Sequence, residues 1–219
     1  MNCCCAPPPT QGTNDFFSQR AAKFLRKFRK KGLDKETRLL EQGILGGAIA
    51  GASILEIGCG VGGLHMRLLQ QGAATATGID IAAGMIDGAR QLSAELGLDH
   101  RVQYSIGDFA AQPEPFEKAD IVIMDKVVCC YEQIDLLMRE SLIRASTTYA
   151  IVFPRDTPLS RIGFQMFIAA LRIIRLRFHP FWHDWEKMNG TIIASGFEEQ
   201  YSASTLLWTA RVYRRPCNR

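Results

Sequence analysis

Long apolar runs and targeting segments are missing from this sequence. Its most apolar C-terminal segment has an uncharged centre at 162–171, well short of the about 20 residues that a membrane-spanning helix needs. The first residues lack the basic stretch and the apolar stretch that together form a secretory signal. No internal repeat is visible. The sequence therefore gives no support for a membrane-spanning or repeat architecture, and we expect a cytoplasmic location.

The cysteines show neither the pattern of a disulfide framework nor the spacing of a metal site. The seven cysteines include a run at 3–5 and the neighbours Cys129 and Cys130, without the two-residue spacing of a zinc site. An odd number of cysteines favours a reducing compartment, in agreement with the cytoplasm. We expect no metal site, and we interpret Cys129 and Cys130 as small buried residues rather than nucleophiles.

The charge is nearly balanced. Lysine and arginine number 26 against 22 aspartates and glutamates, so the net charge is only +4. That excess is too small to predict nucleic-acid binding. A length of 219 residues, 47% hydrophobic, suits one globular domain with one or two insertions.

The rest of the chain is organised around a short apolar run that ends in a glycine turn. Residues 53–57 predict a buried strand, and glycines follow at 58, 60, 62 and 63 before a helical pattern. Glycines allow the backbone to approach a ligand closely, and the first N–H groups of the helix face that ligand. Gly58, Gly60 and Gly63 match the dinucleotide pattern G-x-G-x-x-G, a weak signal alone. Glu56, just before them, repels a pyrophosphate and suits a cationic ligand.

Acidic residues stand at the ends of four successive predicted strands. After Glu56, Asp80 lies at the end of 75–81, Asp108 just after 102–106, and Asp125 at the end of 119–125. Because the carboxyl ends of parallel strands meet at one edge of an open sheet, we expect these four carboxylates to line one ligand site. Asp80 is placed to accept hydrogen bonds from two ribose hydroxyls.

The stretch E-I-G-C-G-V-G at 56–62 and the acidic residues that follow it resemble the class I S-adenosylmethionine-dependent methyltransferases. The resemblance covers residues 32–215. It implies a Rossmann-like, doubly wound, mostly parallel seven-stranded α/β sheet with an antiparallel C-terminal hairpin, here at 197–203 and 206–213. It also implies S-adenosyl-L-methionine as cofactor, with Asp108 at the adenine amino group and Phe109 along the ring. The cofactor-binding residues expected on this basis are Glu56, Gly58, Gly60, Gly62, Asp80, Ile81, Met85, Asp108, Phe109 and Asp125.

Within this class, residues 123–131 resemble a small-molecule subset that includes the magnesium-protoporphyrin enzyme. Cys129, Cys130 and Tyr131 stand where Ile-His-Tyr is expected in that subset. No Asn-Pro-Pro-Tyr follows the fourth strand, which disfavours the enzymes that methylate amino groups of nucleic acids.

Three segments flank or interrupt the predicted domain. Residues 1–14, rich in cysteine, proline and small polar residues, predict a disordered tail. Residues 15–50 predict a helical cover made of an amphipathic basic helix over 15–31 and a second helix over 33–45 capped by Asp34. An alternative interpretation of the basic helix is a surface for peripheral contact with a membrane. The domain is expected over 51–219, and a helical insertion at about 157–195 is either a lid over the acceptor or a helix packed on the sheet with its arginines outward.

These features predict methyl transfer to a small-molecule acceptor, at oxygen, nitrogen or carbon. In-line displacement from a sulfonium depends mainly on alignment, so the protein needs at most a general base, for which Tyr131, His179 and His183 are the candidates. The alternatives are an NAD(P)-dependent oxidoreductase and a non-catalytic cofactor-binding protein that docks on a membrane or RNA. Glu56 and the C-terminal hairpin argue against the oxidoreductase. Nucleic acid is not expected as a partner, and nothing in the sequence specifies the oligomeric state.

Overall fold

A computed structural model describes residues 9–111, 116–173 and 178–216 of the chain. Most of the predicted tail and the run of cysteines at 3–5 lie outside the described residues.

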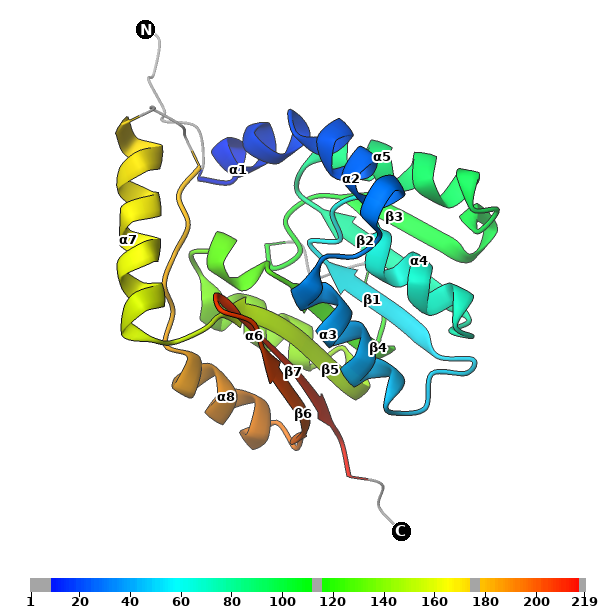
Figure 1. Ribbon diagram of the computed structural model, residues 1–219. Coiled ribbons are helices and arrows are strands. Elements are labelled where there is room, and N and C mark those ends of the chain that lie inside the picture. The colour runs from blue at the N-terminus through cyan, green and yellow to red at the C-terminus, as the bar shows by residue number, and fades with distance from the viewer. Residues whose placement is uncertain (1–8, 112–115, 174–177, 217–219) are drawn as a thin grey trace, which may run out of the picture.

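A seven-stranded sheet forms the centre of the molecule (Figure 1), with the strand order β3-β2-β1-β4-β5-β7-β6. Parallel pairing joins β1 to both β2 and β4, whereas β7 lies between β5 and β6 and is antiparallel to both. The predicted mostly parallel sheet with an antiparallel C-terminal hairpin is therefore confirmed. The strands are β1 (Ser53–Ile57), β2 (Thr75–Asp80), β3 (Val102–Ile106), β4 (Ala119–Asp125), β5 (Ala145–Pro154), β6 (Glu198–Ser204) and β7 (Trp208–Arg214).

Helices cover both faces of this sheet. The described helices are α1 (Pro9–Ser18), α2 (Ala21–Lys31), α3 (Lys35–Leu45), α4 (Gly63–Gln70), α5 (Ala83–Glu95), α6 (Ile134–Leu142), α7 (Pro158–Ile173) and α8 (Trp185–Ala194), with short 3₁₀ turns at Asp99–Arg101 and Val128–Cys130. One apolar core joins the strands to α2, α3, α4 and α5, and the other joins them to α6 and α8. Burial of these two cores supplies the main driving force for folding.

The N-terminal cover differs from its prediction. Residues 9–14 were expected in the tail but are helical, and the single helix expected over 15–31 is divided between α1 and α2. The end of α1 packs closely on the start of α5 at Gly84. A Cβ atom at this position would lie only 2.8 Å from the backbone oxygen of Ser18, so the close packing requires glycine. The predicted cap of α3 is confirmed, because the Asp34 side chain accepts a hydrogen bond from the Thr37 backbone N–H.

The predicted insertion contains two helices with different surroundings. α8 packs against α6 and β6 and belongs to the body of the domain. α7 stands at the edge of the molecule beside α1 (Figure 1), and the chain that follows it places Phe178 against Phe16, with ring centroids 4.6 Å apart. No helix in the described part of the chain is long and apolar enough to cross a membrane.

Candidate functional site

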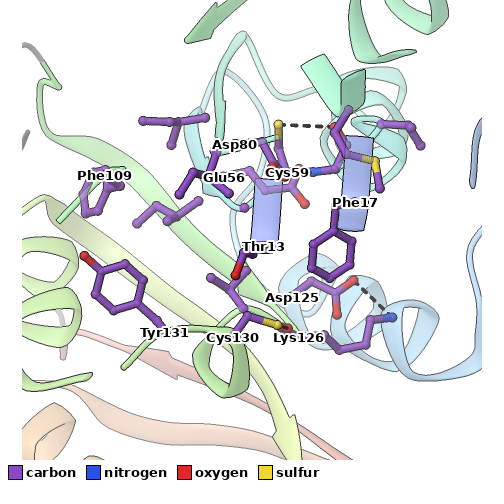
Figure 2. A pocket seen from close by; sticks show the side chains of 18 of the residues that line it. Thr13, Phe17, Glu56, Cys59, Asp80, Phe109, Asp125, Lys126, Cys130 and Tyr131 are labelled. Atoms are coloured by element: carbon purple, nitrogen blue, oxygen red, sulfur yellow. Dashed lines mark hydrogen bonds and ion pairs between the residues drawn. The ribbon is translucent and has the colours of Figure 1, made fainter. Parts of the chain in front are cut away.

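A cavity of about 970 Å³ opens at the carboxyl ends of β1, β2 and β4. Figure 2 shows side chains of the glycine turn, the strand ends and α1 around this cavity, and residues of α2 line it as well. Every predicted cofactor-binding residue except Gly62 lines this cavity. The four acidic residues predicted at successive strand ends therefore do meet at one site, as an open parallel sheet requires.

Two glycines of the turn serve different purposes. Gly60 has φ 55°, and a Cβ built on it would meet nothing within 4 Å, so this residue leaves open space for a ligand. A Cβ on Gly58 would lie 2.4 Å from Val127 Cγ2, so Gly58 is needed for packing. Gly62 precedes α4 and is not among the residues that line the cavity, whereas Gly63 is.

Glu56 is held by a histidine that the sequence pattern did not assign to it. The Glu56 Oε2 atom accepts hydrogen bonds from His65 Nδ1, at 2.5 Å, and from the His65 backbone N–H, at 3.3 Å. The other ring nitrogen of His65 lies 3.1 Å from the Tyr104 hydroxyl. Both side chains of the pair are buried, with exposed fractions of 3% and 0%. Since both contacts use Oε2, the Oε1 atom of this cavity-lining carboxylate is left for a ligand.

Asp80 ties β2 to the glycine turn. Its two oxygens accept hydrogen bonds from the backbone N–H groups of Gly60 and Ala82, each at 2.8 Å. Burial raises the pKa of Asp80. Each carboxylate oxygen has a second acceptor position, so both can still receive hydroxyl donors from a ligand.

Asp108 is paired with Tyr131, one of the three candidate bases. Its Oδ1 atom accepts hydrogen bonds from the Tyr131 hydroxyl, at 2.7 Å, and from the backbone N–H of Ala110, at 3.1 Å. Burial and the Asp108 carboxylate raise the pKa of Tyr131, so its phenol is a hydrogen-bond donor at neutral pH. Tyr131 thus lies in the cavity wall beside the predicted adenine position.

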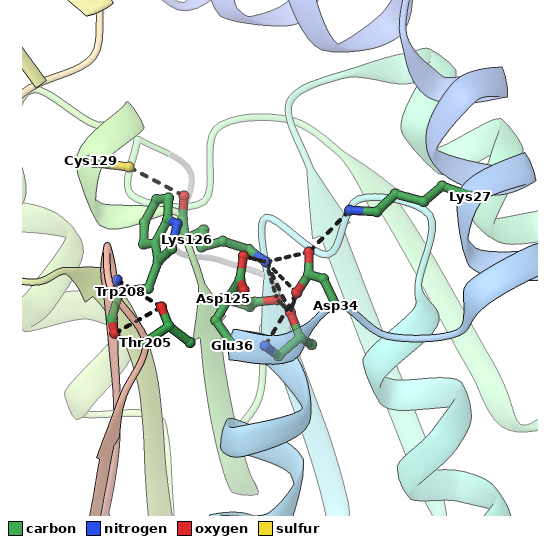
Figure 3. Close-up of polar contacts among 9 residues, drawn as sticks. Lys27, Asp34, Glu36, Asp125, Lys126, Cys129, Thr205 and Trp208 are labelled. Atoms are coloured by element: carbon green, nitrogen blue, oxygen red, sulfur yellow. Dashed lines mark hydrogen bonds and ion pairs between the residues drawn. The ribbon is translucent and has the colours of Figure 1, made fainter. Parts of the chain in front are cut away.

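The end of β4 contributes a charged cluster that the sequence did not predict. Figure 3 shows Lys126 extended toward Asp34, with Asp125 close by. The Asp125 Oδ2 atom accepts a hydrogen bond of 2.6 Å from Thr37, whereas its Oδ1 atom is buried and has no hydrogen-bond partner among the described residues. Burial raises the pKa of Asp125 to about 6 despite the nearby Lys126 ammonium. A carboxylate with an unpaired oxygen in a cavity wall suits a ligand that donates hydrogen bonds or carries positive charge.

The two histidine candidates differ in position. His179 lines the cavity, whereas the described lining does not include His183. His183 Nε2 lies 2.8 Å from the backbone oxygen of Tyr131, and burial lowers the pKa of this imidazole. The neutral ring therefore donates to that carbonyl and supports the segment that carries Tyr131.

The first two helices supply lining residues that sequence reasoning missed. Thr13 and Phe17 of α1 and Phe24 and Phe28 of α2 face the cavity. The phenylalanine spacing predicted a helical cover, but it did not show which of these side chains would face the cavity. Among the described residues no group of three or more His, Cys, Asp or Glu is arranged to hold a metal ion.

Comparison with known proteins agrees with this geometry. Residues 54–143 match the family model described as a methyltransferase domain, and this range contains all four acidic residues. The ubiquinone biosynthesis O-methyltransferase of Xylella fastidiosa is 41% identical over 71 residues, which cover 32% of this chain and 28% of that protein. The biotin biosynthesis bifunctional protein of Teredinibacter turnerae is 32% identical over 112 residues, or 48% of this chain and 19% of that protein. The match thus spans less than a third of the length of either relative.

Solved structures extend the comparison to nearly the whole chain. Magnesium protoporphyrin IX methyltransferase from Synechocystis, solved with bound SAH, has a TM-score of 0.70 at 20% identity, covering 93% of this chain and 98% of that one. A methyltransferase domain model thus matches the part of the chain that contains the glycine turn and the four carboxylates, and the whole chain shares the fold of that solved methyltransferase. The predicted resemblance to the class I S-adenosylmethionine-dependent methyltransferases is therefore confirmed. The position of β7 between β5 and β6 also separates this methyltransferase fold from the 3-2-1-4-5-6 order of dinucleotide-binding domains.

Proposed function

We propose that this protein binds S-adenosyl-L-methionine in the cavity and transfers its methyl group to a small-molecule acceptor. The observation that carries the proposal is the convergence of four carboxylates, from four strand ends, on the open side of a glycine turn. Such a cavity attracts a ligand with positive charge and repels a dinucleotide pyrophosphate.

Each carboxylate has a distinct role in this proposal. The carboxylates of Glu56 and Asp125 receive the ammonium group of the donor, Asp80 receives the ribose hydroxyls, and Asp108 receives the adenine amino group. Phe109, Ile81 and Met85 supply the apolar surface around the ring. These residues all line the cavity, which supports the assignment.

The acceptor in this proposal is a largely apolar small molecule. The cavity volume lies at the upper end of the about 300–1,000 Å³ of small-molecule sites, which leaves room for a second molecule beside the donor. Phe17, Phe24 and Phe28 supply apolar wall, and Tyr131 and His179 supply polar groups. Of the candidate bases, His179 is the one we retain, because the Tyr131 phenol stays protonated and His183 is outside the cavity lining. Cytoplasmic location and the domain boundaries at 14 and 50 stay predictions.

Isothermal titration calorimetry with S-adenosylhomocysteine tests the proposed donor site. The wild type should bind this ligand and not a nicotinamide dinucleotide. Asp80→Asn should weaken binding by about 1–3 kcal/mol, because an acceptor for ribose hydroxyls is lost. Asp120→Asn is the matched control. The Asp120 carboxylate also accepts a hydrogen bond from a backbone N–H group, that of Ser53, but it lies at the amino ends of the strands, away from the cavity. Binding of the dinucleotide alone would favour the oxidoreductase instead.

A further inference from the structure

The exposed apolar side chains of this protein are concentrated in one region. Among the described residues twelve large hydrophobic side chains are exposed, and seven of them lie on α7 or in the turn between β6 and β7. The exposed fractions of these seven run from 47% to 80%. They are Leu159, Ile162, Met166, Phe167, Ile173, Leu206 and Leu207. A cluster of this kind marks an interaction surface, whereas scattered exposed apolar residues do not.

The two segments form one continuous face. Just before α7, the backbone N–H of Arg155 donates a hydrogen bond of 2.8 Å to the backbone oxygen of Leu207. Along α7, four of the five exposed apolar residues recur at spacings of three, four and seven, which places these four on one side of the helix, and Phe167 lies next to them. The opposite side is already packed: Leu171 is buried, and the Phe164 ring lies edge-on to Trp182 at 5.2 Å.

The charge of this region identifies its partner. Residues 155–178 contain five arginines and one aspartate, a net charge of +4 that equals the net charge of the whole chain. The rest of the protein therefore sums to zero. Arg161 is paired with Asp156 at the start of α7, and three further arginines follow in the sequence at 172–177. An apolar helix without acidic residues and with this excess of arginine in its sequence fits the headgroup region of an anionic bilayer. A protein interface would instead have few charges at its centre.

We infer that α7 and the β6–β7 turn form a docking face for the surface of an anionic lipid bilayer. This places membrane contact on a different helix from the one predicted, since α2 buries Ala21 and Leu25 and turns Phe24 and Phe28 to the cavity. The docking face also adjoins the site, because His179 and Phe181, which follow α7, line the cavity. A bilayer held there would lie beside the part of the cavity wall that His179 and Phe181 form. The inference concerns a surface and does not depend on the proposed reaction.

Vesicle flotation of the full-length protein tests the inference without any activity assay. The wild type should float with vesicles of phosphatidylcholine mixed with phosphatidylglycerol, and less with phosphatidylcholine alone or in high salt. The triple variant Ile162→Ser, Met166→Ser, Leu206→Ser should lower the partition coefficient at least about tenfold, because three exposed apolar groups no longer enter the bilayer.

A matched triple variant at exposed apolar positions elsewhere, Ile106→Ser, Ile143→Ser and Ile193→Ser, should bind like the wild type. All six side chains are exposed, so thermal unfolding should be nearly unchanged in both variants and would reveal a folding defect. Wild type that stays unbound with the mixed vesicles would overturn the inference, and so would equal binding by the α7 triple variant. A dimer in light scattering that only the α7 variant dissociates would assign the face to a second copy of the chain.

Discussion

Lys126 Nζ lies 2.9 and 3.0 Å from the two carboxylate oxygens of Asp34, which joins the end of β4 to the cap of α3. The lysine backbone has φ 61°, an uncommon conformation for a residue with a side chain. The pair therefore links the helical cover to the end of β4 in the cavity wall.

Replacing Lys126 by methionine should lower the free energy of unfolding by about 1–3 kcal/mol, because the half-buried Asp34 loses its closest charged partner and keeps only the longer contact of 3.6 Å with Lys27. Chemical denaturation measures this change. Lys187→Met is the control, since Lys187 forms a comparable contact of 2.9 Å with Asp135 on the exposed surface. That pair should contribute less than about 1 kcal/mol. Equal losses in both variants would refute a special role for Lys126.

The same pair predicts a dependence of stability on pH. The Lys126 ammonium and Thr37 lower the pKa of Asp34 below 3.8 against the effect of burial, so its stabilising contribution is present above pH 3.8 and is lost as pH falls through the lower folded value. The carboxylates of Asp125 and Asp34 raise the pKa of Lys126 above 10.5. The stabilising contribution of the lysine is therefore complete below pH 10.5 and is lost as pH rises through the higher pKa of the folded state. Lys126→Met should flatten the stability profile at both ends.

The ionised Asp125 side chain should lower the stability of the fold and strengthen binding of the donor. Its pKa of about 6 exceeds the ordinary 3.8, so the folded state holds the proton more tightly and stability should fall as pH rises from about 4 to 6. Asp125→Asn should therefore stabilise the fold at neutral pH by about 2–3 kcal/mol. Donor affinity should change in the opposite direction. Wild-type affinity for S-adenosylhomocysteine should rise up to about tenfold per pH unit until pH 6, then level off.

Asp125→Asn should bind the donor more weakly, and its affinity should depend less on pH. The pH dependence that remains in this variant should come from Asp80, because burial raises the pKa of that carboxylate as well. Calorimetric titrations from pH 5 to 8 give the affinities, and urea denaturation over the same range gives the stabilities. A variant that is less stable and binds as tightly as the wild type would contradict this assignment.

His65→Leu should destabilise the protein by about 3–5 kcal/mol, because it leaves the buried Glu56 carboxylate without its partner. His100→Leu, at an exposed position of the Asp99–Arg101 turn, provides the control and should cost little. Thermal unfolding in the presence and absence of S-adenosylhomocysteine would show whether the loss is confined to the fold. A small effect would mean that His65 only fills space.

The glycine turn predicts a contrast between two alanine variants. Gly58→Ala combines a positive φ with a clash against Val127 and should destabilise the fold by more than about 2 kcal/mol. Gly60→Ala has the backbone strain without the clash, so its loss of stability should be smaller, about 1 kcal/mol, whereas its loss of donor binding should be larger. Similar profiles for both variants would contradict the separate roles of the two glycines.

The parts of this structure that the sequence could predict are those fixed by local pattern and by topology. β1, the glycine turn and α4 follow one another within a short stretch, and each has its own sequence signal. Glu56, Asp80, Asp108 and Asp125 were predicted to meet because parallel strands end at one edge of a sheet, whatever the surrounding side chains. The order of elements was enough for that inference.

The sequence could not predict which side chains of distant segments pair with one another. Asp34 and Lys126 are 92 positions apart, and nothing in either local pattern indicates the other. Gly62 was expected to line the site, but in the structure it precedes α4 outside the cavity lining, where a Cβ on it would lie 2.8 Å from the His65 ring. The outer face of α7 was expected to be a lid or a packed helix, since sequence spacing shows that a helix has an apolar side but not whether another element covers it.

The central claim is that four carboxylates at the rim of the sheet hold a cationic adenosyl donor. A crystal structure of the protein with S-adenosyl-L-methionine tests it most directly. The account predicts electron density with the adenine amino group at Asp108, the ribose at Asp80 and the ammonium between Glu56 and Asp125. Density for the donor elsewhere on the protein, or with its ammonium turned away from both Glu56 and Asp125, would contradict the account.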